Sequence, residues 1–222
     1  MKLLDAVLAA RDAQKLFTPA SVQKILTAIV GLDKLGADFR WKTSVYPEKQ
    51  IEGGVLDGDL ILYGTGAPDF TTGGAEALAA QLRAKGLRRV KGNVVGDESY
   101  FKGDKLGDGW AWSDIQWYFG AEASALSINY NQVKISIENG KPTVEPSTDL
   151  VQISGDVKPP EKGETDAIGV KRELGSNKVY VWGNGKNLDS HVAVENPALW
   201  SAQVFPNTKP RDMRDESRTA GF

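Results

Sequence analysis

The chain has 222 residues, with 27 Lys and Arg against 29 Asp and Glu, which gives a formal net charge of -2. This balance provides no basic field for a phosphate backbone and argues against nucleic acid as a partner. No stretch of the sequence approaches the ~20 consecutive apolar residues that a membrane span needs. Cysteine is absent and His191 is the one histidine, so neither a zinc site nor any other metal or organic cofactor is expected.

The first predicted element is a helix over residues 21–35, where apolar residues recur at steps of three and four. This spacing is typical of a helix that buries one stripe. Pro19 precedes its start and Gly36 ends it, as expected for helix boundaries. The residues before it include MKLLDAVLAARD, an apolar run that Asp5 interrupts, and it is too short and too polar to predict a secretory signal.

From residue 40 onward the pattern changes to short β-rich segments separated by Gly, Pro, Asn and Asp, the residues that favour turns. One helix is predicted within residues 73–86, which are rich in Ala and Leu and bounded by Gly. The other segments, predicted as strands, are 40–48, 53–64, 87–97, 132–139, 141–146, 150–157, 167–174 and 177–183.

Residues 187–196, which contain His191, are interpreted as a loop entering a strand. We expect an ordinary, partly exposed histidine there rather than the base of a Ser-His-Asp triad. Residues 195–205 form a further predicted helix, with Asn196 as cap and Pro197 in the first turn. The polar residues 206–222 lack periodicity and predict a disordered tail. The order of elements favours an α+β protein in which a β-rich insertion, residues 40–195, separates residues 1–39 from residues 196–222.

Ser21 and Lys24 are the candidate catalytic pair. On a helix, residues three apart lie on one face with Cβ atoms about 5–6 Å apart, so the Lys24 amine can reach the Ser21 hydroxyl. A lysine can activate a serine as its base when burial disfavours the charged form, and Ala20, Ile25 and Ala28 would supply apolar surroundings. The amide dipoles at the helix start would favour a developing negative charge.

A structural interpretation of the same pair remains open. The pattern S-x-x-K is short, and a second copy occurs at Ser99 and Lys102, after a predicted strand where no helix start would align the two groups. In this interpretation Ser21 is a helix cap and Lys24 extends into solvent.

The wider sequence resembles a known family. The segment FTPASVQKILTAIVGLDKLGADFRWKTSVY resembles the P-A-S-x-x-K segment of the active-site-serine penicillin-recognising enzymes. Later segments, among them GVLDGDLILYGTGAPDF, VKGNVVGDESYF and ENPALWSAQVF, narrow the resemblance to class C low-molecular-mass penicillin-binding proteins, which are D-alanyl-D-alanine carboxypeptidases and endopeptidases. It extends from about residue 10 to 205. It implies a partial transpeptidase/β-lactamase-like helical layer, with Ser21 as the acylated serine and Lys24 as its proton acceptor.

The family completes its site with the motifs S-x-N and K-T-G. The sequence contains no K-T-G. A literal S-x-N occurs at Ser127 and Asn129, but alignment places it in the inserted region, so we expect the match to be accidental. The resemblance therefore implies a truncated form that lacks the second and third motifs.

Two further features have a functional and a structural interpretation. Asp97 falls where the family places an acidic residue that meets the amino group of the stem peptide's diaminopimelate; alternatively it is a turn aspartate. An aromatic cluster could stack on sugars or peptides, although a packed corner of the insertion is the expected arrangement; its members are Trp110, Trp112, Trp117, Tyr118 and Phe119.

The sequence therefore favours a serine DD-peptidase that acts on peptidoglycan peptides through an acyl-serine, that binds β-lactams and that resides outside the cytoplasm, as the resemblance implies. Two alternatives stay open. One is an impaired relative that binds peptidoglycan or a partner without catalysis. The other is a hydrolase of small esters that uses the same serine.

Overall fold

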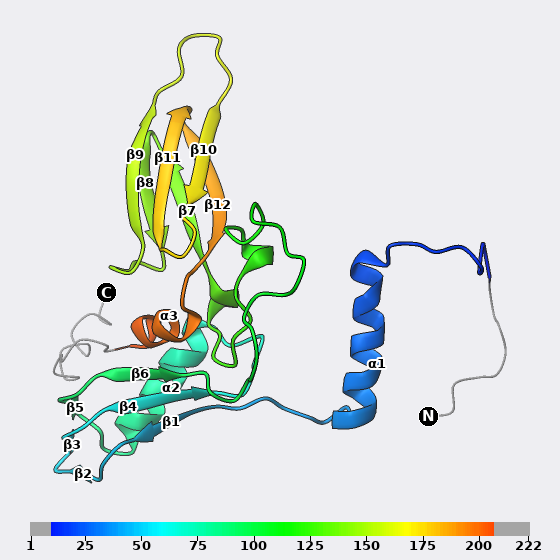
Figure 1. The fold of residues 1–222 in the computed structure, drawn as a ribbon. Coiled ribbons are helices and arrows are strands. Elements are labelled where there is room, and N and C mark those ends of the chain that lie inside the picture. The colour runs from blue at the N-terminus through cyan, green and yellow to red at the C-terminus, as the bar shows by residue number, and fades with distance from the viewer. Residues whose placement is uncertain (1–9, 207–222) are drawn as a thin grey trace. The chain divides into compact units, whose positions relative to one another are not determined.

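The computed structural model describes residues 10–206. The chain divides into two compact units, residues 1–41 and residues 42–222, each described by itself below. Helices and strands are mixed along the chain (Figure 1), which confirms the predicted α+β class. The division of the chain into three parts at residues 39 and 195 stays a prediction.

The first unit contains one helical element. A 3-10 turn, η1 (Ala20–Val22), leads directly into α1 (Gln23–Leu35). Gly36 ends the helix with a φ of 82°, a left-handed conformation that glycine adopts readily, and its amide donates to the Leu32 carbonyl at 3.0 Å. The predicted helix is confirmed. The first unit by itself does not bury the predicted stripe, because α1 contains no buried residue.

The second unit begins with two small sheets. The first has the order β1-β4-β6 and is formed by β1 (Thr43–Pro47), β4 (Leu60–Gly64) and β6 (Val94–Asp97). The second has the order β2-β3-β5 and is formed by β2 (Ile51–Glu52), β3 (Val55–Leu56) and β5 (Arg89–Val90). The predicted second helix is α2 (Thr72–Ala84), and its Ala75 and Ala79 lie in one buried cluster with Leu60 and Leu62.

Two three-stranded sheets follow and face each other in Figure 1. One has the order β12-β7-β8, formed by β7 (Gln132–Glu138), β8 (Lys141–Glu145) and β12 (Asn187–Ala193). The other has the order β10-β11-β9, formed by β9 (Gln152–Lys158), β10 (Ala167–Arg172) and β11 (Lys178–Asn184). Alternate residues of these strands are buried between the sheets, Ile135 and Val181 among them, as expected when two sheets share a core.

The full length of β12 was missed by sequence reasoning, which interpreted its first residues as a loop. Polar residues alternate in it with Leu188 and Val192, and Asn187, Asp189 and Ser190 are all turn-favouring types. Pairing with β7 along seven residues holds this segment extended. Local composition therefore favoured a turn, and tertiary pairing prevailed.

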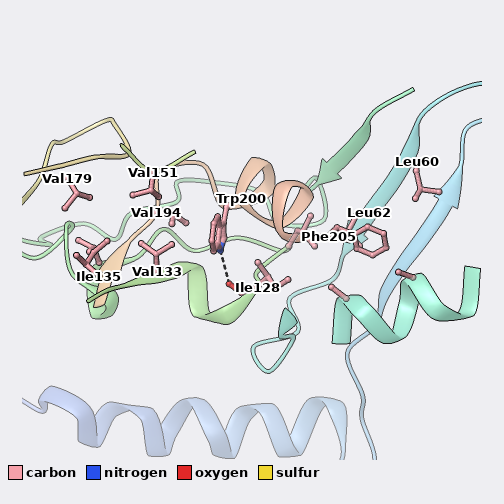
Figure 2. Packing of buried hydrophobic residues seen from close by; sticks show 14 of the residues in the cluster. Leu60, Leu62, Ile128, Val133, Ile135, Val151, Val179, Val194, Trp200 and Phe205 are labelled. Carbon is pink, nitrogen blue, oxygen red and sulfur yellow. Dashed lines mark hydrogen bonds between the residues drawn. The ribbon is translucent and has the colours of Figure 1, made fainter. Parts of the chain in front are cut away.

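The last described helix, α3 (Pro197–Val204), confirms the predicted start. The Asn196 side chain accepts a hydrogen bond from the Leu199 amide at 3.1 Å. Trp200 is fully buried, and its indole donates to the Ile128 carbonyl at 3.3 Å, as Figure 2 shows. Gly96 of β6 permits α3 to approach, because a Cβ atom there would overlap the Ala198 carbonyl. The predicted tail, residues 206–222, lies almost entirely outside the described residues.

Candidate active site

Ser21 and Lys24 lie side by side at the start of the first helix. Ser21 is in η1 and Lys24 is the second residue of α1. Nζ of Lys24 donates a hydrogen bond to Oγ of Ser21 at 2.9 Å. The contact that the spacing predicts is therefore present. No side chain caps the start of η1 or α1, so the interpretation of Ser21 as a helix cap is wrong.

The surroundings of this pair differ from expectation. Both residues are exposed, as is every residue of η1, and Ile25 is 59% exposed. A lysine accepts a proton only in its uncharged form, which burial favours. Within the described part of the first unit the pair thus has the contact that proton transfer requires but not the apolar surroundings predicted from Ile25 and Ala28. The catalytic roles of Ser21 and Lys24 stay predictions.

Ser127 and Asn129, the literal S-x-N match, both form hydrogen bonds with other residues of the second unit. The Ser127 hydroxyl donates to the Ser124 carbonyl at 3.1 Å and accepts from Nδ2 of Asn131 at 2.9 Å. Asn129 accepts from the Thr72 amide at 3.0 Å and donates to the Thr72 hydroxyl at 2.8 Å. Both side chains are therefore occupied by hydrogen bonds within the second unit, and the accidental nature of the match stays a prediction.

Asp97 lies at the end of β6 and is half-buried. Its carboxylate accepts a hydrogen bond from the Ser99 amide two residues on, at 2.9 Å. This is the contact of a turn aspartate, and it leaves the second carboxylate oxygen for another donor. A substrate-binding role for Asp97 stays a prediction.

Four members of the aromatic cluster are exposed and do not form the packed corner that we expected, whereas the fifth, Trp117, is half-buried and pairs with Val192 of β12. Trp110 is 43% exposed and Trp112 is 76% exposed, while Tyr118 and Phe119 are 57% and 59% exposed. The Tyr118 and Phe119 rings contact each other edge to face with centroids 5.3 Å apart. The long segment between β6 and β7 that carries them contains two short 3-10 turns, η2 (Tyr118–Gly120) and η3 (Asn129–Asn131), and no longer helix or strand.

His191 is exposed on β12, paired in register with Lys134 of β7. This confirms the expected ordinary histidine. The neighbouring Asp189 accepts a hydrogen bond from the Ser136 hydroxyl at 2.8 Å and forms an ion pair with Lys134 at 3.0 Å. The hydrogen bond from Lys134, followed by that from Ser136, lowers the pKa of the Asp189 carboxyl.

A charged cluster in the second unit was missed by sequence reasoning. Lys105 forms ion pairs with Glu98 and, at 3.6 Å, with Glu122, while the buried Arg172 contacts Glu195 at 3.4 Å. These residues come from segments far apart in sequence, so no local spacing signals their proximity. An open depression of about 530 Å³ lies beside them, lined by Asp104, Lys105, Leu106, Glu122, Glu195 and Asn196.

Burial and charge shift the pKa values in this cluster. Burial, with the charge of Glu195, raises the pKa of the Glu122 carboxyl. For Lys105 burial acts to lower the pKa, but the hydrogen bond and charge of Glu98, with Glu122, prevail and raise it. Burial lowers the pKa of Arg172 against the opposing effect of Glu195. The guanidinium also donates to the Ile115 and Ser176 carbonyls, both at 2.7 Å, so the cluster joins loop segments to β10.

Over residues 10–206 no group of three or more His, Asp or Glu side chains could hold a metal ion. No helix in the same range is long and apolar enough to cross a membrane.

Residues 3–210 match the model of the D-Ala-D-Ala carboxypeptidase 3 (S13) family. The D-alanyl-D-alanine carboxypeptidase of Actinomadura sp. (strain R39) is 28% identical over 211 residues, which cover 88% of this chain and 39% of that protein. The D-alanyl-D-alanine carboxypeptidase DacB of Haemophilus influenzae is 36% identical over 112 residues, which cover 50% of this chain and 23% of that protein.

A solved structure is also similar. The crystal structure of penicillin-binding protein 4 from Haemophilus influenzae superposes with a TM-score of 0.71 at 27% sequence identity, covering 89% of this chain and 45% of that one. The chain thus spans less than half the length of each of these relatives.

Proposed function

The chain belongs to the D-Ala-D-Ala carboxypeptidase 3 (S13) family, and on that premise we propose that Ser21 is the acylating serine of a DD-peptidase, with Lys24 as its proton acceptor. The substrate class is the stem peptide of peptidoglycan, which ends in two D-alanines. β-Lactams, which acylate serine enzymes of this kind, are the second class of ligand. The family and the names of the relatives support a home outside the cytoplasm, where peptidoglycan lies.

The chemistry follows from the two side chains. Uncharged Lys24 takes the proton of the Ser21 hydroxyl as Oγ attacks the carbonyl between the two D-alanines. The peptide C–N bond breaks, the terminal D-alanine leaves with that proton on its amine, and an ester joins Ser21 to the remaining peptide. Water then cleaves the ester and restores the serine.

One observation carries this proposal: the 2.9 Å contact between the Lys24 amine and the Ser21 hydroxyl. Proton transfer requires hydrogen-bond reach between base and nucleophile, and this pair satisfies it within a single helical turn. No second element is needed to bring the two groups together.

The rate is expected to be low. Groups that act as a unit in catalysis lose most of their effect when one member is removed, and the sequence contains no K-T-G strand to clamp the substrate carboxylate. The exposure of both side chains is also expected to lower the rate. Low-dielectric surroundings strengthen the interactions that stabilise a developing charge, and an exposed pair lacks them. The second candidate function, binding of peptidoglycan without turnover, is favoured by these two observations.

Labelling with a fluorescent penicillin tests the proposal. The chain is incubated with the reagent for minutes to hours and separated on a denaturing gel, beside the Ser21→Ala variant. A fluorescent band that develops slowly in the parent chain and is absent from Ser21→Ala is the expected result. Equal labelling of both proteins would exclude Ser21 as the nucleophile.

A further inference from the structure

The depression beside the charged cluster lies where two distant parts of the second unit meet. Its lining combines residues of the long segment between β6 and β7 with Glu195 and Asn196, which join β12 to α3 (Figure 1). The residues from the long segment are Asp104, Lys105, Leu106 and Glu122. Side chains that cross from one part to the other therefore control how wide the depression is.

Glu122 makes the crossing contacts. Its side chain is 13% exposed, and its carboxyl group lies within hydrogen-bond reach of the Glu195 carboxyl. One of its oxygens is 3.5 Å from the Asn196 amide nitrogen, and the other is 3.6 Å from the Lys105 amine. An ionised carboxylate can only accept hydrogen bonds. A hydrogen bond between Glu122 and Glu195 therefore requires one shared proton.

The charges around this pair also favour a shared proton. The charged groups that face it are Glu98, Asp104 and Lys105 from the long segment and Arg172 from β10. Lys105 contacts both Glu98 and Glu122, and the buried Arg172 contacts Glu195 at 3.4 Å. Three carboxyl groups thus share two cations, and Asp104 adds another negative charge at the depression. One proton on the pair leaves two negative charges against the two cations.

The same surroundings give the latch its dependence on pH. Burial, followed by the charge of Glu195, raises the pKa of Glu122, although the Asn196 amide and Lys105 act in the opposite direction. The proton is therefore held more tightly while the two parts touch than after they separate. By linkage, contact is favoured at low pH and weakens as pH rises from the ordinary glutamate pKa through the raised one. Above that range both carboxyl groups are charged and repel each other.

Other contacts limit how far the long segment can move. The Ala193 amide donates to the Gln116 carbonyl at 2.9 Å, and the Arg172 guanidinium donates to the Ile115 carbonyl at 2.7 Å. These bonds involve no carboxyl group, so they hold residues 115–116 against β12 and β10 whatever the state of Glu122. Movement on loss of the proton is thus confined to the residues around the depression.

We propose that Glu122 and Glu195 form a proton-operated latch on this depression. While they share a proton, the long segment is held against the junction of β12 and α3 and the depression is narrow. When the proton is lost, the two carboxylates repel each other, and the side of the depression that carries Lys105 moves away from residues 195–196. This device lies within the second unit and does not depend on the function proposed for Ser21.

Distances between two spin labels at pH 5 and pH 8 test the latch. The sequence contains no cysteine, so the labels attach only where cysteines are introduced. Leu106→Cys and Leu199→Cys place one label at the depression and one on α3, at positions that are 40% and 44% exposed. The labels should lie further apart at pH 8 than at pH 5 by at least about 1–2 Å, the scale of element shifts in switching transitions.

Three controls accompany this measurement. Glu122→Gln cannot lose a proton, so in this background the labels should keep their pH 5 separation at both pH values, and Glu195→Gln should have the same effect. Glu138→Gln, at an exposed glutamate of β7, should retain the full shift. A second label pair on the facing sheets, Lys141→Cys with Lys178→Cys, should show the same separation at both pH values.

Equal separations of the first label pair at pH 5 and pH 8 overturn the proposal. A parent-like shift in Glu122→Gln overturns it as well, because another group would then be responsible. So does an equal shift of the second label pair, because the change of pH would then act on the whole second unit. Circular dichroism at both pH values confirms that each variant is folded.

Discussion

The amine of Lys24 donates a hydrogen bond to the hydroxyl of Ser21 at 2.9 Å, from a position three residues further along the chain. If this amine accepts the serine proton, Lys24→Ala should slow acylation by a reactive β-lactam about 10²- to 10⁴-fold, the usual contribution of a general base. Following adduct formation by intact-protein mass spectrometry over time measures the rate.

Lys34→Ala is the matched control for this prediction. Lys34 is also an exposed lysine of α1, and its amine lies 3.0 Å from the Asp33 carboxylate. Its replacement should leave the acylation rate within about twofold, since surface ion pairs contribute little. A comparable loss in Lys34→Ala would show that the charge of the helix, and not the position of one amine, controls acylation.

Trp200 anchors the second unit. It is fully buried, and its indole donates to the Ile128 carbonyl. Trp200→Ala should lower the free energy of unfolding by about 3–5 kcal/mol, through the cavity and the unsatisfied carbonyl. Urea unfolding measures this, and Trp112→Ala, at a 76% exposed site, should change it by less than about 0.5 kcal/mol. Equal effects would contradict the assignment of Trp200 to the core.

The contact between β6 and α3 depends on the absence of a side chain at Gly96. Gly96→Ala should lower the free energy of unfolding by about 1–3 kcal/mol, because the new methyl group would overlap the Ala198 carbonyl. Gly73→Ala is the control in α2, where the nearest atom would lie 3.8 Å away. It should raise stability by up to about 1 kcal/mol, since alanine favours a helix. Calorimetric unfolding of both variants checks the opposite signs.

Glu122 should make stability depend on pH. Burial, with Glu195, raises the pKa of Glu122, so the folded chain holds this proton more tightly than the unfolded chain. Its contribution to stability is therefore present at low pH and declines as pH rises from the ordinary glutamate pKa through the raised one. Glu122→Gln should stabilise the chain more at pH 8 than at pH 4.

Urea unfolding at the two pH values measures this difference. Glu138→Gln, a change at an exposed glutamate of β7, provides the control and should give nearly the same effect at both. A larger gain for Glu122→Gln at pH 4 than at pH 8 would contradict the assigned direction of the shift.

Much of the fold could be predicted because its signals are local. The period of residues 21–35 predicted α1, and Asn196 with Pro197 predicted the start of α3. The strand β12 was missed where its composition favours a turn, since its extended form depends on pairing with β7. The first unit by itself leaves the helix stripe exposed, because periodicity shows that a face is apolar and not what covers it.

In the candidate site too, contacts between residues close in sequence could be predicted and contacts between distant segments could not. Ser21 and Lys24 could be paired from sequence because the helix itself brings residues three apart together. The cluster of Glu98, Lys105, Glu122 and Glu195 could not, since the chain must fold before these segments meet.

Peptide mapping after incubation with benzylpenicillin tests the central claim most directly. The account predicts a penicilloyl group on the peptide that contains Ser21, with fragment ions that place it on that hydroxyl, and no adduct in Ser21→Ala. An adduct on any other residue, or a parent chain that stays unmodified after prolonged exposure to a large excess of reagent, would contradict it.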